Sequence, residues 1–383
     1  MTLNEEDIVL KVLHTADWHL GKRFRTFGQN ETKLRRARLE VIERILSLAE
    51  RHAVHAVLCA GDLFDDPMPD QAWWQGLADL FRKKAWKDRP VFLLPGNHDP
   101  LLADSVWAME HKFRRSLPDW VHVIDRELVE HPLPGNGVLY AVPCRNKAGQ
   151  ADPTETIPKR QAGDERIRIG LAHGSTFDLA DCQVNFPIHR DAALRSNLDY
   201  LAIGDTHGFR FVPPDRKLQP TVYPGAPEPT AFDEVAPGKV AIVFFNRRRE
   251  ARVQDEHVAH WMWEEITVRN LLELQAVASR SDLANRVMRL HVEMSIPPRE
   301  MEDAERLLEN LTGTEAKPGR VGILDLHRDG LVLDTSDPTS LAELPELLQE
   351  AAKRLKALES DPRQAETAKR ALAHLCRLAR KAS

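Results

Sequence analysis

The chain has 383 residues, 42% hydrophobic and 29% charged, which predicts a soluble globular protein with two or three domains. Its net charge of -5 argues against a protein that coats nucleic acid through overall positive charge, although a local basic rim is compatible with it. We expect a cytoplasmic protein without disulfides or a cysteine zinc site, because there is no signal core, no run of ~20 apolar residues and no paired spacing among Cys59, Cys144, Cys182 and Cys376.

The first predicted strand, residues 8–14, is followed closely by Asp17 and His19. Side chains two residues apart in extended backbone point the same way, so this pair can share one ion. Asp-x-His alone is weak, since a solvated turn is an equally good interpretation. A helix beginning at Asn30 and ending near Arg51 then presents an apolar face at helical spacing, which we interpret as core.

Two further strands carry polar residues at their ends. Asp62 follows the strand 53–60 and a glycine, and Asn97, His98 and Asp99 follow the strand 91–94 and a Pro-Gly turn. The helix between them contains Trp73 and Trp74, which could stack bases but fit core packing better at this spacing.

The same arrangement recurs later in the chain. After strands near 121–124 and 138–142 and an exposed loop at 146–166, His173 follows the strand 167–172, and Asp205 and His207 follow the strand 199–203. Residues 221–224 and 239–245 are predicted to be antiparallel strands that close a layered sandwich, and Arg247 to Arg249 occupy a hairpin turn where solubility explains them best.

The recurrence of Asp, Asn and His at five strand ends, with glycine at the turns, predicts a two-metal site. Open α/β sheets place their sites at the carboxyl ends of strands. Two cations roughly 3.5 to 4 Å apart need a shared carboxylate, with carboxylate, amide and imidazole completing each sphere. Such a pair activates water and binds phosphate oxygens, so phosphate ester hydrolysis is the expected chemistry.

These motifs resemble a known family. Asp17-x-His19, Gly61-Asp62, Gly96-Asn97-His98-Asp99, His173 and Gly204-x-x-His207 are similar to the signature of the calcineurin-like metallophosphoesterases, and the surrounding sequence is similar to the SbcD branch of DNA-repair exonucleases. The resemblance covers about the first 245 residues. It implies an α/β fold, a layered β-sandwich flanked by helices, with a small α+β cap domain and a C-terminal helical hairpin.

The resemblance also implies roles for individual residues. Asp17, His19, Asp62 and His207 would hold one metal, with Asp62 bridging to a second metal held by Asn97, His173 and Asp205. Manganese is the expected ion, with magnesium as the alternative. His98 would act beside the phosphate as a proton donor or transition-state stabiliser, oriented by Asp99.

The chain departs from the family pattern at two positions. Asp205 stands where the family usually has histidine, which should favour hard ions and weaken Lewis acidity at that metal. Asp65 and Asp66 stand where the nuclease branch often has a histidine, which puts a DNA-handling role there in doubt.

Candidate substrate contacts are less specific. Lys22, Arg23 and Arg25 could meet backbone phosphates, although a solvated basic loop is nearly as good an interpretation. His257 and His260 have i,i+3 spacing but lie in a stretch without a convincing helical pattern, so a metal role is a minor alternative.

The second half of the chain lacks the ligand pattern. A strand at 288–294, a helix at 298–311 closed by Gly313 and a strand at 321–326 predict a small α+β module. Two amphipathic helices, 341–358 and 362–381, meet at Asp361-Pro362, a natural N-cap and first helical residue. The predicted domains are 1–262 (nuclease), 263–336 (cap) and 337–383 (tail).

The resemblance implies that the cap selects DNA form and that the tail docks on the coiled coil of an SbcC-like ATPase. The alternatives are a structural lid and simple packing of the tail on the cap. DNA is the expected substrate, a homodimer is compatible with the sequence and no membrane is expected. Rival functions are a phosphatase or cyclic-nucleotide phosphodiesterase, and a non-catalytic scaffold motivated by Asp205.

Overall fold

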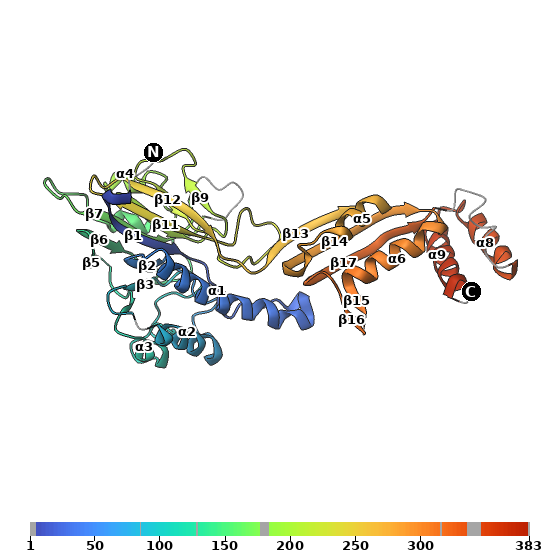
Figure 1. The fold of residues 1–383 in the computed structure, drawn as a ribbon, viewed down its shortest axis with the longest axis horizontal. Helices are drawn as coiled ribbons and strands as arrows, with labels where there is room; N and C mark the ends of the chain where they lie inside the picture. Colours follow the sequence, from blue (N-terminus) through green and yellow to red (C-terminus); the bar gives the residue numbers. More distant parts are fainter. Residues whose placement is uncertain are drawn as a thin grey trace. The chain divides into compact units, whose positions relative to one another are not determined.

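The computed structural model describes residues 5–84, 86–127, 129–176, 184–314, 316–334 and 346–381. The chain divides into two compact units, Met1–Trp261 and Met262–Ser383. Figure 1 labels the helices and strands of each unit. The predicted domain boundary at residue 336 and the cysteine Cys182 lie outside the described residues.

The first unit contains two six-stranded sheets that pack face to face, as predicted for a layered sandwich. In one sheet the strand order is β12 (Ala251–His257), β11 (Lys239–Asn246), β1 (Ile8–Thr15), β2 (Ala56–Cys59), β3 (Val91–Leu93) and β4 (Val121–Val123). In the other it is β5 (Glu130–Leu133), β6 (Gly137–Ala141), β7 (Ile167–His173), β8 (Tyr200–Gly204), β10 (Thr221–Tyr223) and β9 (Arg210–Val212).

Parallel pairing positions the site. Strands β1 to β4 run parallel to one another, and so do β6, β7, β8 and β10. The carboxyl ends of these parallel strands therefore meet at one edge of each sheet. The polar residues that follow β1, β2, β3, β7 and β8 begin at these edges.

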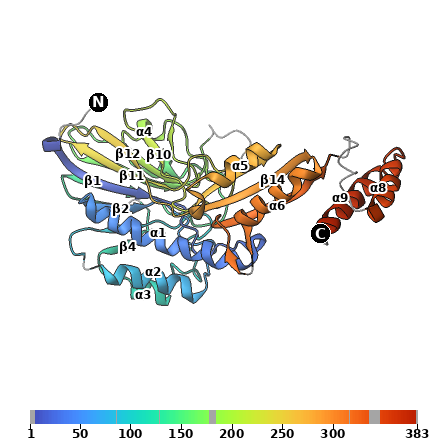
Figure 2. The ribbon, with the colours of Figure 1, turned by 45° about the vertical axis from the view of Figure 1, so that its right-hand side comes forward.

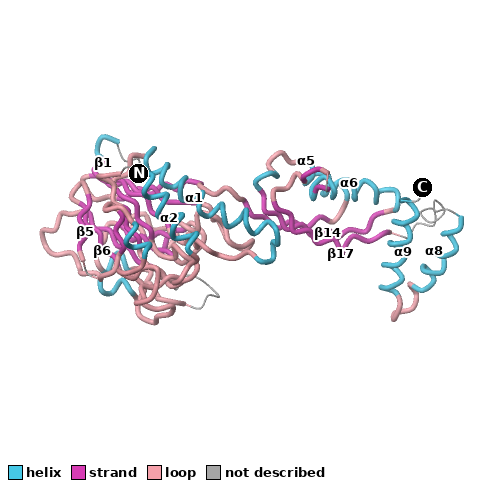
Figure 3. The backbone as a smooth tube through the Cα atoms, turned by 90° about the horizontal axis from the view of Figure 1, so that it is seen from below, coloured by secondary structure: helices cyan, strands magenta, loops and turns pink. Residues whose placement is uncertain are grey.

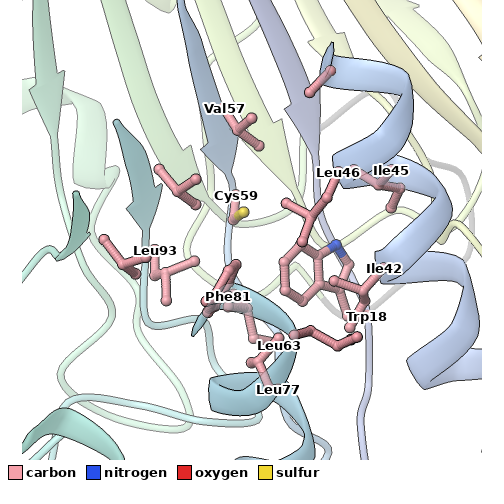
Figure 4. Packing of buried hydrophobic residues seen from close by; sticks show 14 of the residues in the cluster. Trp18, Ile42, Ile45, Leu46, Val57, Cys59, Leu63, Leu77, Phe81 and Leu93 are labelled. Atoms are coloured by element: carbon pink, nitrogen blue, oxygen red, sulfur yellow. The ribbon is translucent and has the colours of Figure 1, made fainter. Parts of the chain in front are cut away.

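Helices cover the outer faces of the sandwich. The helices α1 (Glu31–Arg51) and α2 (Gln71–Lys83) pack their apolar residues on the β1–β4 sheet, and Figure 2 shows both on the same side of these strands. In Figure 4, Ile42 and Leu46 of α1 and Phe81 of α2 surround the indole of Trp18. Short elements complete this unit: η1 (Glu5–Asp7), η2 (Arg25–Asn30), α3 (Lys112–Ser116), η3 (Pro153–Thr156) and α4 (Ala192–Arg195).

The second unit contains a three-stranded parallel sheet in the order β13 (Met262–Val268), β14 (Arg286–Ile296) and β17 (Ile323–Leu333). Helices α5 (Leu271–Ser279) and α6 (Pro298–Thr312) bury their apolar residues against it, and Figure 3 shows them on one side of the strands. Gly313 ends α6 as predicted, with φ 86°. Also described are η4 (Leu283–Asn285), β15 (Gly313–Thr314), β16 (Lys317–Pro318), α8 (Glu346–Leu358) and α9 (Ala365–Lys381).

The terminal helices α8 and α9 pack on each other through Ala352 and Leu372, which are fully buried. Residues 341–345 of the first predicted tail helix lie outside the described residues, and the second begins three residues later than predicted, because Asp361 and Pro362 form a turn. None of the helices in the described part of the chain combines the length and apolar character that crossing a bilayer requires.

Local expectations had mixed outcomes. Strands β10 and β11 each have an antiparallel neighbour, as expected, β9 for β10 and β1 for β11, but they lie in different sheets and β10 is also parallel to β8. Asn30 precedes α1, but its side chain makes no capping hydrogen bond because its backbone is already helical. His257 ends strand β12, in agreement with the expectation that the stretch containing His257 and His260 is not helical.

Candidate metal centre

The loops after β1 and β2 are joined at the site by backbone hydrogen bonds. The amides of Asp17 and His19 donate to the carbonyl oxygens of Gly61 and Asp62 at 3.1 and 3.0 Å. Trp18, between the two predicted ligands, is buried in the core under α1, and its indole Nε1 donates to Thr15 Oγ1 at 2.9 Å. The packing of Trp18 in the core thus directs the side chains of Asp17 and His19 toward the edge of the sandwich.

The backbone at the site is strained rather than extended. Asp17, His19 and Asp62 have φ angles of 54°, 45° and 54°, in the left-handed region that residues with a Cβ rarely adopt. The expectation of an extended Asp17-x-His19 segment was therefore wrong in its backbone geometry. The convergence of the two side chains was predicted correctly, since tight turns hold them at the same point as His207.

Two glycines make room for the ligands. A Cβ on Gly61, where φ is 91°, would lie 2.2 Å from Nδ1 of His173. A Cβ on Gly96 would lie 2.2 Å from Oδ1 of Asp62. The glycines at these strand ends are therefore required for close approach between loops as well as for turning the chain.

The ligand atoms form two overlapping groups. Those of Asp17, His19 and His207 all lie within 4.8 Å of one another, and so do those of Asp17, Asp62 and His173. Asp62 faces both groups, because its Oδ2 is 3.8 Å from His19 Nε2 and its Oδ1 is 3.4 Å from His173 Nε2. This is the position that a bridging carboxylate requires.

Asn97 and Asp205 also lie at the second group. Asn97 Oδ1 is 2.7 Å from His173 Nε2, and Asp205 Oδ1 is 3.8 Å from the same nitrogen. The Asp205 amide donates to the Asp17 carboxylate, with a distance of 3.1 Å to Oδ1. All of the predicted ligand residues are thus brought together, with Asp205 beside the second group.

The three histidines share one orientation. Nδ1 of His173 donates to the Ala60 carbonyl at 2.8 Å, and Nδ1 of His207 donates to Glu234 Oε1 at 2.6 Å. Nδ1 of His19 faces Asp65 Oδ1 at 3.2 Å. Each Nε2 is consequently left to face the ligand cluster, which is how metal-binding histidines are usually held.

A cation would resolve an otherwise unfavourable contact. Nε2 of His19 and Nε2 of His207 lie 3.0 Å apart. Two neutral rings with Nδ1 protonated would direct their lone pairs at each other, and either a proton on His207, whose pKa is raised by Glu234 against the effect of burial, or a bound cation relieves this contact. Carboxylate, imidazole and amide donors together suit divalent cations such as manganese, magnesium and zinc. The residues present therefore fit a binuclear divalent metal site.

Burial and charge oppose each other at the site. Burial lowers the pKa of the His19 imidazole to about 3, so it is a neutral ligand. Burial also acts to lower the pKa of His173, but the hydrogen bond and charge of Asp62 together with the charges of Asp17 and Asp205 outweigh it, and the net pKa rises to about 10. Burial raises the pKa of Asp17. So many buried acidic groups favour a cation among them.

His98 and Asp99 occupy different environments. The His98 side chain is 44% exposed, its ring packs edge-on to His19 at 4.9 Å between centroids, and its backbone amide donates to Asp62 at 2.9 Å. Asp99 is fully buried, and its carboxylate accepts from the amides of Phe64 and Gly96 at 3.0 and 2.8 Å. These hydrogen bonds join the loop after β2, which contains Phe64, to the loop after β3, which contains Gly96 and His98. Asp99 therefore positions His98 by fixing the backbone of its loop.

The sequence did not indicate three residues that contact the ligands. Glu234 holds His207, Ser175 Oγ donates to Asp205 at 2.5 Å, and Asp65 lies beside both His19 and His98. The sequence marks Asp65 only as a departure from the family pattern. Asp65 lies three residues after Asp62 and Ser175 two residues after His173, so nearness in sequence to a predicted ligand could have suggested both. Glu234 has no such neighbour in the sequence.

The basic residues after the first ligand pair line a cavity of ≈ 530 Å³ next to the site. Lys22 Nζ lies 3.4 Å from Asp65 Oδ1, which connects this cavity to His19. Arg23, Arg25 and Trp73 also line it. Trp74 is buried in the core as predicted, whereas Trp73 is only partly buried.

The fold and the site together define a class of protein. A model of the calcineurin-like phosphoesterase family matches residues 10–209, just over half of the chain and all of the strand-end ligands. The chain belongs to this family, which supports a metal-dependent hydrolase.

Three relatives share part of this chain. It is 30% identical over 179 residues to the SbcD subunit of the nuclease SbcCD of Bacillus subtilis, covering 43% of this chain and 42% of that protein. It is 23% identical over 230 residues to the uncharacterized metallophosphoesterase YhaO of Bacillus subtilis, covering 56% and 52%. It is 30% identical over 90 residues to the DNA double-strand break repair protein Mre11 of Methanococcus maripaludis, covering 24% and 23%. The matches span about half or less of the length of these relatives.

Proposed function

We propose that the protein is a cytoplasmic, divalent-metal-dependent DNA nuclease that hydrolyses phosphodiester bonds. The observation that carries the proposal is the convergence of carboxylate, amide and imidazole side chains from separate strand ends onto two overlapping ligand groups. Family membership supports hydrolysis of a phosphate ester. The relatives named as a nuclease and as a DNA break repair protein support DNA as the substrate.

Asp17, His19, Asp62 and His207 would hold one ion, and Asn97, His173 and Asp205 would hold the other with Asp62 between them. A bound ion pair supplies an activated water and neutralises charge on the phosphate oxygens. Manganese is favoured, with magnesium as the alternative, because the donor set is rich in oxygen and Asp205 adds a further carboxylate.

His98 is placed to act on the substrate. Its ring is exposed at the edge of the ligand cluster, while its backbone is fixed by the hydrogen bond to Asp62. An imidazole held there can donate a proton to the leaving oxygen or stabilise charge that develops on the phosphate. Asp99 supports this position by joining the loops that carry His98 and Phe64.

Lys22 and Arg23 would bind backbone phosphates of the substrate strand. The cavity that they line adjoins the ligand cluster through Asp65. Arg25 and the partly buried Trp73 line the same cavity, so a strand there would meet cations and one aromatic ring.

The second unit would provide the cap, and the amphipathic pair α8 and α9 would dock on the coiled coil of an SbcC-like ATPase. Among the described residues of the two helices, Ala352 and Leu372 are buried and Leu348, Leu355 and Leu375 are only partly buried, so part of this apolar face would be open to a partner helix. The relative named as a subunit of SbcCD supports an assembly of this kind. A homodimer is compatible with the proposal.

Two alternatives remain distinct from the nuclease. A phosphatase or cyclic-nucleotide phosphodiesterase shares the metal centre, since the same family model covers phosphoesterases in general. A non-catalytic scaffold is favoured by a single feature, the carboxylate of Asp205 at a position where the resemblance predicts imidazole.

The deciding experiment compares hydrolysis of labelled duplex DNA, single-stranded DNA and a small phosphomonoester by the full chain with manganese. We expect DNA to be cleaved, the phosphomonoester to be a poor substrate, and cleavage to fall roughly 10²- to 10⁴-fold for His98→Ala. His257→Ala, which alters an exposed histidine at the end of β12, is the matched control and should cleave normally. Hydrolysis of the phosphomonoester with DNA left intact would favour the phosphatase, and full metal content without any hydrolysis would favour the scaffold.

A further inference from the structure

A second cavity, of ≈ 570 Å³, lies at the opposite end of the sandwich from the ligand cluster. It is lined by the β11–β12 turn and the start of β12, by β9, and by the residues that precede β8 and β10. The β11–β12 turn lies beside Ile8, the first residue of β1, whereas Asp17 follows the last. Eight residues of strand separate the two, which corresponds to roughly 25 Å.

The floor of this cavity is apolar because two sheet edges leave it uncovered. Strand β12 is the edge of one sheet and β9 is the edge of the other. Phe211 on β9 and Val253 on β12 pack against the core between the sheets but stay partly exposed, and both line the cavity. Leu218, which is 72% exposed, extends the apolar lining. A cavity between two sheet edges that is lined by the ring of Phe211 suits a flat apolar group.

The rim of the cavity carries an excess of positive charge. Lys217 and Arg248 are exposed and line it. Of the acidic lining residues, Asp199 is offset by Arg160, from which its Oδ2 accepts at 2.7 Å, whereas Glu250 accepts from the neutral side-chain amide of Asn246 at 2.7 Å and keeps its charge. The two exposed cations outnumber this one carboxylate. The rim therefore suits an anion, and especially a phosphate group.

Two other arginines of the lining do not supply this charge. Arg249 pairs with Glu165 at 3.0 Å. The guanidinium of Arg252 lies 4.5 Å from the ring centroid of Phe244, which faces α1 rather than the cavity. Lys217 and Arg248 are thus the cations that an anionic ligand would meet.

An amide pair stands beside the apolar floor. Gln219 Nε2 donates to Asn197 Oδ1 at 2.8 Å, and both residues line the cavity. Side-chain amides recognise the edges of nucleobases, and aromatic rings stack on their faces. The volume is also within the range of small-molecule sites.

We propose that this cavity binds a nucleoside monophosphate, with the base between Phe211 and Val253 and the phosphate at Lys217 and Arg248. The inference stands apart from the proposed nuclease function, since it needs neither bound metal nor hydrolysis. It assigns the arginine-rich β11–β12 turn a role beyond solubility.

The test measures binding of deoxyadenosine 5′-monophosphate to the full chain in excess EDTA, by equilibrium dialysis, with deoxyadenosine and inorganic phosphate as separate arms. We expect one saturable site for the nucleotide and binding at least about tenfold weaker in both partial arms, because each supplies only half of the contacts. The site should persist in Asp62→Ala, which alters the metal centre only.

Two variants and two matched controls locate the site. Arg248→Glu and Leu218→Glu should each weaken binding about tenfold or more, since they place negative charge at the phosphate or at the apolar floor. Arg247→Glu alters the same turn outside the cavity, and Val235→Glu alters another residue that is 80% exposed, so both should bind normally. All four positions are exposed, so each variant should fold, and circular dichroism checks this.

Three results would overturn the inference. No saturable binding in EDTA would exclude the site, and loss of binding in Asp62→Ala would place the nucleotide at the metal centre instead. Inorganic phosphate that binds as tightly as the nucleotide would show a simple anion site without recognition of the base.

Discussion

Nε2 of His19 lies 3.0 Å from Nε2 of His207, although 188 residues separate them in the sequence. The opposite nitrogen of each ring faces a carboxylate, Asp65 or Glu234. The two Nε2 atoms are therefore directed at one point, and this contact is favourable only when a proton on His207 or a cation lies between them. Metal binding and folding stability are coupled at this contact.

We accordingly expect manganese to stabilise the protein against unfolding. At a free concentration 100 times the dissociation constant, one bound ion adds about 2.7 kcal/mol. Thermal unfolding of EDTA-treated protein, with and without added manganese, measures the shift. Asp62→Ala should abolish most of it, whereas the exposed Asp66→Ala should retain it, and a shift of equal size in both variants would contradict the assigned ligands.

Gly61→Ala should damage the metal centre more than it damages the fold. The new Cβ would lie 2.2 Å from Nδ1 of His173, which displaces the ring from its hydrogen bond with Ala60 and its Nε2 from Asp62. Gly163→Ala is a matched control because Gly163 also has positive φ, 80°, but no atom lies within 4 Å of its Cβ position. Both variants should lose about 1 kcal/mol of stability through backbone strain.

Metal content then separates the two substitutions. After reconstitution and removal of free manganese, elemental analysis should show reduced metal in Gly61→Ala and unchanged metal in Gly163→Ala. Equal metal content in both variants would mean that His173 is not a ligand.

The sequence predicted which side chains come together at the site, because each lies at the end of a short apolar strand. Periodicity locates a strand end, and parallel pairing then brings such ends together, so Asp17, Asp62 and His173 could be grouped without coordinates. What the sequence could not predict was which strands pair. Residues 221–223 and 239–246 have similar apolar patterns, yet they joined different sheets, since pairing depends on the whole sandwich.

Elements with weak local patterns were also missed. Strand β12 reads Ala-Arg-Val-Gln-Asp-Glu-His and lies at a sheet edge with most side chains partly or fully exposed, so it lacks a hydrophobic face. Strands β5 and β13 and helix α5 were missed as well. Ser175 and Glu234 contact ligands 30 and 27 residues away in sequence, a relationship that only the folded chain defines.

Asp205→His should change the metal preference of the site. Asp205 now accepts a hydrogen bond from Ser175 and approaches His173, and a carboxylate there favours hard ions. Imidazole binds zinc well, so the variant should bind zinc relative to manganese roughly tenfold more tightly than the parent. Competition binding with the two ions measures the ratio, and an unchanged ratio would indicate that Asp205 stands outside the coordination sphere.

Ser175→Ala tests whether the position of the Asp205 carboxylate, rather than its role as a metal ligand, depends on the hydrogen bond from Ser175. It removes the hydrogen bond to Asp205 without changing any predicted ligand, so a smaller change in metal affinity is expected in the same competition assay. A loss as large as that of Asp62→Ala would show that the Asp205 carboxylate depends on Ser175 for its position.

The buried pair of His14 and Tyr200 should make the fold sensitive to acid. His14 Nδ1 and Tyr200 Oη are 2.8 Å apart and connect β1 to β8, and both residues are fully buried. Burial lowers the pKa of His14 from 6.5 to about 3. The unfolded chain therefore takes up a proton below pH 6.5 that the folded chain refuses until about pH 3, and stability falls as the pH drops through this window.

Between pH 7 and pH 5 this residue should cost about 2 kcal/mol of unfolding free energy. The double variant His14→Phe, Tyr200→Phe removes both members of the pair and keeps ring volume, so the backbone of Ile203 is the one group that loses a hydrogen-bond partner, equally at both pH values. Urea unfolding of EDTA-treated parent and double variant at the two pH values gives the difference directly, with the other titrating groups cancelling. An equal loss of stability in both proteins would show that His14 does not carry the acid sensitivity, and that it is protonated as readily in the folded chain as in the unfolded one.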